Sequence, residues 1–141
     1  MARRLTMYLV DTNIWLEMLL EQERADDARQ FLTNTDGELI AITEFSADSV
    51  GVILTRLGKD KLYEDFISDT LEDTAIMRVR LEPADLRRLL EVRKRFNLDF
   101  DDAYQYVAAE RHGMTLVSFD ADFDRTELGR RTPDQALGGT R

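Results

Sequence analysis

Three short apolar runs of this chain each end at a carboxylate, and stretches with helical spacing separate them. The runs are residues 7–10 before Asp11, residues 38–43 before Glu44 and residues 114–119 before Asp120. Short apolar runs bounded by turn residues are typical of buried strands. Buried strands that alternate with helices predict an α/β fold: a three-layer α/β/α sandwich with a central, mainly parallel sheet. Because the carboxyl ends of parallel strands share one edge, we expect the three acids to lie close together.

The segments between these runs have the apolar spacing of helices with one buried side. We expect helices over 13–20, from 21 to about 32, and over 45–57, 59–72, 83–96 and 98–112. Residues 76–81 alternate apolar residues with arginines, which predicts a strand with one less buried face. The expected core positions include Val50, Ile53, Leu54 and Leu57 of one helix and Leu86, Leu89 and Leu90 of another.

Length and composition indicate one soluble domain. The 141 residues are 43% hydrophobic and 33% charged, and we expect residues 1–137 to form a single domain followed by a disordered tail over 138–141. No apolar run approaches the roughly 20 residues of a membrane span. The first apolar run stops at Asp11, short of a signal-peptide core of about 7–15 residues. We therefore expect a cytoplasmic protein.

The residue types that are absent restrict the kind of metal site. The chain has no cysteine and one histidine, which excludes thiolate zinc sites and histidine-rich sites. Any metal must therefore be held by oxygen. The net charge of −9 argues against a protein that binds nucleic acid mainly by counterion release. An enzyme that recruits divalent cations is less constrained, because each bound ion changes the local charge.

A fourth source of carboxylates lies at the start of the helix that follows residue 98. Asp99 and Asp102 are three residues apart, the spacing of a reciprocal cap, so Asp99 has two interpretations: helix N-cap or site residue. Asp102 and Tyr106 share the apolar face of this helix, where a carboxylate needs a partner. Asp11 has the same two interpretations, and its neighbours Thr12 or Asn13 are also candidates to cap the helix that follows.

Clustered carboxylates repel one another and are costly to desolvate. No lysine or arginine lies within three residues of Asp11 or Glu44, so the cluster implies raised pKa values or bound cations. Hard oxygen ligands suit Mg²⁺ or Mn²⁺. Such ions hydrolyse phosphodiesters by activating water and stabilising the leaving oxygen.

Four segments occur in an order that resembles a known family. They are Val10-Asp11-Thr12-Asn13, Thr43-Glu44-Phe45, residues 98–103 (LDFDDA) and residues 116–123 (LVSFDADF). Together they resemble the PIN domain ribonucleases, and among them the VapC-like toxins of toxin–antitoxin pairs. The resemblance extends from Tyr8 to about Ala136.

The resemblance implies an endoribonuclease that binds Mg²⁺ or Mn²⁺ in an acidic pocket. The acids of the family correspond to Asp11, Glu44, Asp102 and Asp120, and Asp122 competes with Asp120 for the last role. Thr12 and Asn13 correspond to polar residues that position water. The resemblance also implies an RNA substrate, a homodimer and, for a toxin, an antitoxin whose segment places an arginine in the pocket.

Two other functions remain as alternatives. One is a catalytically silent PIN-like scaffold in RNA processing. The other is a phosphatase with Asp11 as nucleophile, as in haloacid dehalogenase-like proteins; those proteins have a second Asp two residues later, where this chain has Asn13. The chain also departs from the toxin pattern in residues 51–54 and in the dense carboxylates Asp99, Asp101 and Asp102.

The remaining aromatic and basic residues have structural as well as functional interpretations. Trp15 is expected in the core. Tyr104 and Tyr106 follow Asp102 closely and are able to stack on unpaired bases, but core packing or a subunit contact is the prediction for Tyr106. Two basic segments, Arg87-Arg88 and Arg93-Lys94-Arg95, either line an RNA path or form an ordinary solvated helix surface.

Overall fold

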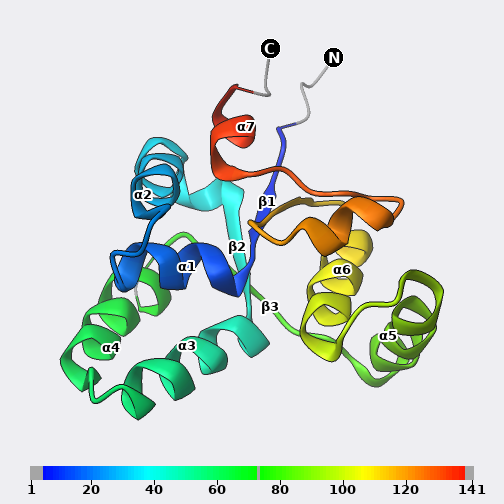
Figure 1. Cartoon of the computed structure of the whole chain (residues 1–141), viewed down its shortest axis with the longest axis horizontal. Helices are drawn as coiled ribbons and strands as arrows, with labels where there is room; N and C mark the ends of the chain where they lie inside the picture. Colours follow the sequence, from blue (N-terminus) through cyan, green and yellow to red (C-terminus); the bar gives the residue numbers. More distant parts are fainter. Residues whose placement is uncertain (1–4, 73, 139–141) are drawn as a thin grey trace.

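The computed structural model describes residues 5–72 and 74–138, and its centre is a four-stranded sheet (Figure 1). The strands are β1 (Tyr8–Val10), β2 (Ile40–Thr43), β3 (Met77–Val79) and β4 (Thr115–Val117). Their order in the sheet is β3-β2-β1-β4, and all three strand pairs are parallel. The predicted parallel sheet is therefore confirmed, and β1, which carries Asp11 at its carboxyl end, is a central strand.

Helices connect the strands as the sequence predicts. They are α1 (Thr12–Leu19), α2 (Ala25–Asn34), α3 (Glu44–Arg56), α4 (Asp60–Phe66), α5 (Pro83–Phe96), α6 (Phe100–His112) and α7 (Pro133–Gly138). The helix expected over 59–72 is divided: α4 passes into a π-helical turn, Ile67–Leu71. A 3₁₀ turn (Gly37–Leu39) precedes β2, so Glu38 and Leu39 are not strand residues, and a second 3₁₀ turn (Ala121–Arg125) follows β4.

Alternate residues of the strands point to two separate cores. Leu9 of β1 packs in the core that α5 and α6 cover. Its neighbours Tyr8 and Val10 pack on the opposite face, in the core that α1, α2, α3 and α7 cover. Helices therefore lie on both faces of the sheet, which confirms the three-layer α/β/α architecture.

Three expected core leucines are exposed. Leu57 and Leu90 are each 55% exposed and Leu86 is 40% exposed. Leu57 lies just beyond the last turn of α3. Helix α5 lies at the outer edge of the molecule (Figure 1), so its buried stripe is narrow and runs through Leu89 and Val92.

Ile53, also expected in the core, is half-buried. The predictions for Val50, Leu54 and Leu89 hold, because each of these residues is at most 1% exposed.

Trp15 is 2% exposed and meets the ring of Phe66 edge to face, with centroids 5.8 Å apart; Tyr106 is also 2% exposed. Gly138, the first residue of the expected tail, ends α7, and residues 139–141 lie outside the described part of the chain. Within the described ranges, none of the helices combines the length and apolar character needed to cross a membrane.

Candidate metal centre

Asp11 is buried at the junction between β1 and α1, where four donors hold its carboxylate. Its Oδ1 accepts hydrogen bonds from the backbone N–H of Thr12 at 2.7 Å and from Nε2 of Gln105 at 3.1 Å. Its Oδ2 accepts from Oγ of Ser118 at 2.7 Å and from Nδ2 of Asn13 at 3.3 Å. Asp11 is therefore the N-cap of α1, and the expectation that Thr12 or Asn13 caps this helix is wrong.

The environment of Asp11 raises its pKa from 3.8 to about 6. Burial is the main cause, because it penalises the charged form. The hydrogen bonds from Ser118, Thr12 and Gln105 lower the pKa and offset part of this effect, while the charge of Asp120 raises it. Asp11 is thus a carboxylate whose charge is only partly stabilised by the protein.

Asp102, Asp120 and Asp122 form a second group of carboxylates. One oxygen of each lies within 4.8 Å of the other two. Asp102 comes from the first turn of α6, whose N-cap Asp99 accepts from the Asp102 N–H at 2.9 Å, as the capping interpretation predicts. Asp120 follows β4 and accepts from the N–H of Asp122 at 2.8 Å.

Asp102 is the least solvated member of this group. It is 7% exposed, and its buried Oδ2 has no hydrogen-bond partner among the described residues. Burial and the adjacent carboxyl of Asp120 raise its pKa to about 8. A buried polar atom without a partner is rare, and carboxylate oxygens are the ligands that Mg²⁺ and Mn²⁺ prefer. The residues present therefore fit a hard divalent cation.

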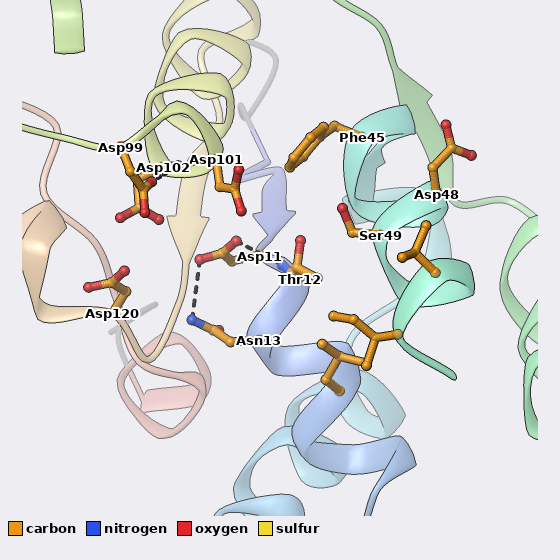
Figure 2. Close-up of a pocket in the computed structure, with 13 residues that line it drawn as sticks. Asp11, Thr12, Asn13, Phe45, Asp48, Ser49, Asp99, Asp101, Asp102 and Asp120 are labelled. Atoms are coloured by element: carbon orange, nitrogen blue, oxygen red, sulfur yellow. Dashed lines mark hydrogen bonds between the residues drawn. The ribbon is translucent and has the colours of Figure 1, made fainter. Parts of the chain in front are cut away.

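Asp11, Asp102 and Asp120 open into one cavity of about 570 Å³ (Figure 2). Figure 2 shows Asp11, Asp102 and Asp120 around a common space, with α3 on the opposite side. The polar lining residues are Asp11, Thr12, Asn13, Asp48, Ser49, Asp99, Asp101, Asp102 and Asp120, and the apolar ones are Leu16, Phe45, Val52 and Ile53.

Comparison with known proteins identifies the family. A model of the PIN domain matches residues 8–128. The chain belongs to the PIN domain family. The family predicted from the sequence is thereby confirmed. None of the curated proteins matches the sequence.

Solved structures with the same fold include toxins of toxin–antitoxin systems. A toxin–antitoxin complex from Klebsiella pneumoniae is 22% identical, with 89% of this chain and 97% of that chain covered and a TM-score of 0.70. VapC20 of Mycobacterium tuberculosis, a sarcin-ricin loop cleaving toxin, is 15% identical, with 86% and 95% covered and a TM-score of 0.74. FitAcB from Neisseria gonorrhoeae is 20% identical, with 90% and 98% covered and a TM-score of 0.72.

The PIN domain brings most of the predicted site residues together, but Glu44 is an exception. Asp11, Asp102 and Asp120 share the cavity with Thr12 and Asn13, and Asp122 lies beside Asp102 and Asp120.

Glu44 begins α3 and is half-buried, and it is not among the described residues that line the cavity. Asp48 lies four residues further along, on nearly the same side of α3 as Glu44, and it lines the cavity together with Phe45 and Ser49. Glu44 stands at the edge of this face, at the first residue of the helix. The role of Glu44 as a metal ligand stays a prediction.

Gln105 is a site residue that the sequence analysis missed. It is 1% exposed, and its Nε2 contacts Asp11 Oδ1, Thr12 Oγ1 at 3.4 Å and Ser46 Oγ. The hydroxyls of Thr12 and Ser46 lie 2.7 Å apart. The available signal was its position three residues after Asp102, which places both side chains on one side of α6. A buried amide there needs polar partners.

Replacing Gln105 by Leu is expected to weaken Mn²⁺ binding by about 10- to 100-fold, the range for partners that orient metal ligands. Leu removes a donor to Asp11 Oδ1, which leaves the carboxylate less fixed and its charge less stabilised. Calorimetric titration with Mn²⁺ measures the effect, and Gln30→Leu on the exposed surface of α2 is the control. Equal Mn²⁺ affinity of Gln105→Leu and wild type would contradict this role.

Proposed function

We propose that this PIN domain is a Mg²⁺- or Mn²⁺-dependent endoribonuclease that hydrolyses RNA phosphodiesters. The observation that supports it is the unpartnered, buried Oδ2 of Asp102 next to carboxylate oxygens of Asp120 and Asp122. Asp11, Asp102 and Asp120 are the proposed metal-binding and catalytic acids, with Asp122 and Glu44 as further candidates. A divalent cation, when bound, supplies Lewis acidity toward the scissile phosphate and lowers the pKa of water.

The residues around these acids fix their positions. Ser118 is central, because its hydroxyl donates to Asp11 Oδ2 and accepts from the Asp120 N–H at 2.9 Å. Asn13 joins the carboxylate of Asp11 to the segment after β4, since its Nδ2 donates to Asp11 and its Oδ1 accepts from the Phe119 N–H at 3.2 Å. These contacts hold the carboxylates of Asp11 and Asp120, which follow the adjacent strands β1 and β4, in one arrangement. Such pre-organisation avoids reorganisation during the reaction.

The raised pKa of Asp102 indicates competition at this carboxyl between a proton and a cation. A carboxyl with a pKa of about 8 retains its proton at neutral pH in the metal-free protein. Ligands must lose their protons to bind metal, so cation binding at Asp102 releases a proton. The metal concentration that gives half-maximal cleavage should therefore fall as the pH rises from 6 to 8.

The function that we propose in the cell is that of a cytoplasmic toxin controlled by an antitoxin. The similar structures include a toxin–antitoxin complex and a toxin, which supports this role. The acidic cavity is complementary to an arginine of an antitoxin segment, because a guanidinium binds carboxylates in bidentate fashion. A homodimer is part of the same proposal.

Incubation of the purified protein with a panel of labelled RNAs tests the nuclease function. We expect internal cleavage in Mn²⁺ or Mg²⁺ that stops when EDTA is added. Because water is the attacking group, the fragments should lack 2′,3′-cyclic phosphate ends. Cleavage that persists in EDTA and leaves cyclic phosphates would contradict the proposed mechanism. Metal-dependent binding of RNA without cleavage would favour the silent scaffold.

A further inference from the structure

Three aromatic side chains stand together at the rim of the acidic cavity. The rings of Phe45 and Tyr104 are stacked, with centroids 5.3 Å apart and planes at 27°. Tyr104 is buried, and its hydroxyl accepts a hydrogen bond from the Leu81 N–H at 3.2 Å. Phe45 lines the cavity, as Figure 2 shows. One face of the Phe45 ring is thus supported from behind by a fixed tyrosine.

Phe100 extends this aromatic surface outward. Its ring centroid lies 5.8 Å from that of Phe45 and 6.2 Å from that of Tyr104. Phe100 is 45% exposed, although it stands between Asp99 and Asp101, which both line the cavity. Phe100 is therefore part of a contiguous aromatic surface next to the cavity, and contiguous exposed apolar surfaces are typical of binding sites.

We propose that Phe45 and Phe100 form a stacking site for one unpaired base of the RNA, next to the phosphate that is cleaved. The inference rests on the proposed function and identifies the substrate as single-stranded at this position. A nucleotide combines a phosphate, which requires cations at the carboxylates, with a flat ring, which requires an aromatic surface. Bases stack on aromatic side chains in proteins that bind single strands.

The rest of the cavity agrees with a bound nucleotide. Its volume of about 570 Å³ lies within the range of about 300–1,000 Å³ that is usual for small-ligand sites. Leu16, Val52 and Ile53 give it an apolar wall, on the side of α1 and α3. The carboxylates of Asp11, Asp102 and Asp120 lie on the other side (Figure 2), while Asp48 lines the cavity from α3. The cavity therefore has one part for an apolar ring and one for a cation-bound anion.

A set of RNAs that each lack one base tests the stacking site. The parent is an RNA that the wild type cleaves, and the readout is kcat/KM for each RNA that lacks one base near the cleaved bond. We expect loss of one particular base to lower wild-type kcat/KM by about 10-fold or more. Phe100→Ala should lower kcat/KM on the intact RNA by a similar factor, and should have little further effect on the RNA without that base.

Three controls keep the result interpretable. Phe100→Tyr retains a flat ring and should cleave the intact RNA as the wild type does, and Phe45→Leu should behave as Phe100→Ala. Leu57→Ala removes an exposed apolar side chain outside the cavity and should leave kcat/KM unchanged on both RNAs.

An equal loss on intact and base-deleted RNA would overturn the stacking site alone. Unchanged cleavage by Phe100→Ala would also overturn it. The aromatic surface would then be a candidate site for binding a protein partner. Absence of cleavage of every RNA by the wild type would overturn the proposed function together with this inference.

Discussion

Asp102→Asn is expected to lower RNA cleavage by at least about 100-fold while leaving the metal-free protein folded and no less stable. Substitution of residues that only orient metal ligands already lowers metal affinity or activity by about 10- to 100-fold. Asp102 is a proposed ligand itself, because it carries the unpartnered buried oxygen. Asn has nearly the shape of the neutral acid, so the buried packing is kept. The measurements are kcat/KM on a cleaved RNA and urea unfolding in EDTA.

The stability part of this prediction depends on pH. Because the pKa of Asp102 is raised to about 8, wild type and Asp102→Asn should be similarly stable at pH 5.5, where the acid is neutral. At pH 8.5 the wild type carries a buried charge and the variant should be the more stable one. Asp26→Asn, whose side chain is 90% exposed, is the control. Activity near wild type in Asp102→Asn would remove this residue from the site.

The second large effect is a loss of stability of the metal-free protein as the pH rises from about 5.5 to 8.5. Asp11 and Asp102 have folded-state pKa values raised to about 6 and about 8, against 3.8 in the unfolded chain. Between these values the native state binds more protons than the unfolded state, so the free energy of unfolding falls with rising pH. Stability from these groups is complete below pH 3.8 and is lost through pH 6 and 8.

Conversion of the pKa changes to free energy gives a loss on the order of 3 kcal/mol between pH 5.5 and 8.5 from Asp102, and about 1 kcal/mol more from Asp11, which loses the rest of its contribution below pH 5.5. Urea unfolding followed by the fluorescence of Trp15, the single tryptophan, measures it in EDTA at each pH. Mg²⁺ or Mn²⁺ at pH 8.5 should restore stability, because a ligand that binds only the native state stabilises it. Equal stability at pH 5.5 and 8.5 in EDTA would contradict the buried carboxylate cluster.

The sequence was sufficient to predict the fold and the edge of the sheet that carries the acids. Each of the segments before Asp11, Glu44 and Asp120 is apolar and short, and a parallel arrangement forces their carboxyl ends together. The position of Glu44 could not be derived in the same way. A helix begins at Glu44 itself, so the turn of the helix, which depends on how Thr43 caps it, decides which α3 residues reach the cavity.

Contacts between distant segments account for what the sequence could not predict. Gln105 meets Asp11, 94 residues away in the chain, only because α6 packs beside β1. Ser46 meets Thr12, 34 residues away, only because α3 packs beside α1. The aromatic surface is a similar case. The sequence pointed to Tyr104 and Tyr106 as candidates for stacking, but both are buried. Phe45 is the ring that lines the cavity, and the exposed Phe100 lies beside it. Periodicity shows which side of a helix is apolar but not how much of that side its neighbours cover.

We propose that Asp11, Asp102 and Asp120 form a cation site whose ligands are all oxygen atoms. Titration with Mn²⁺, followed by the electron paramagnetic resonance of the free ion, tests this site most directly. We expect wild type and Asp26→Asn to bind Mn²⁺ with equal affinity at pH 8. Asp102→Asn should bind it at least about 10-fold more weakly. Equal Mn²⁺ affinity in all three proteins would contradict the proposed cation site, because the ion would then bind elsewhere.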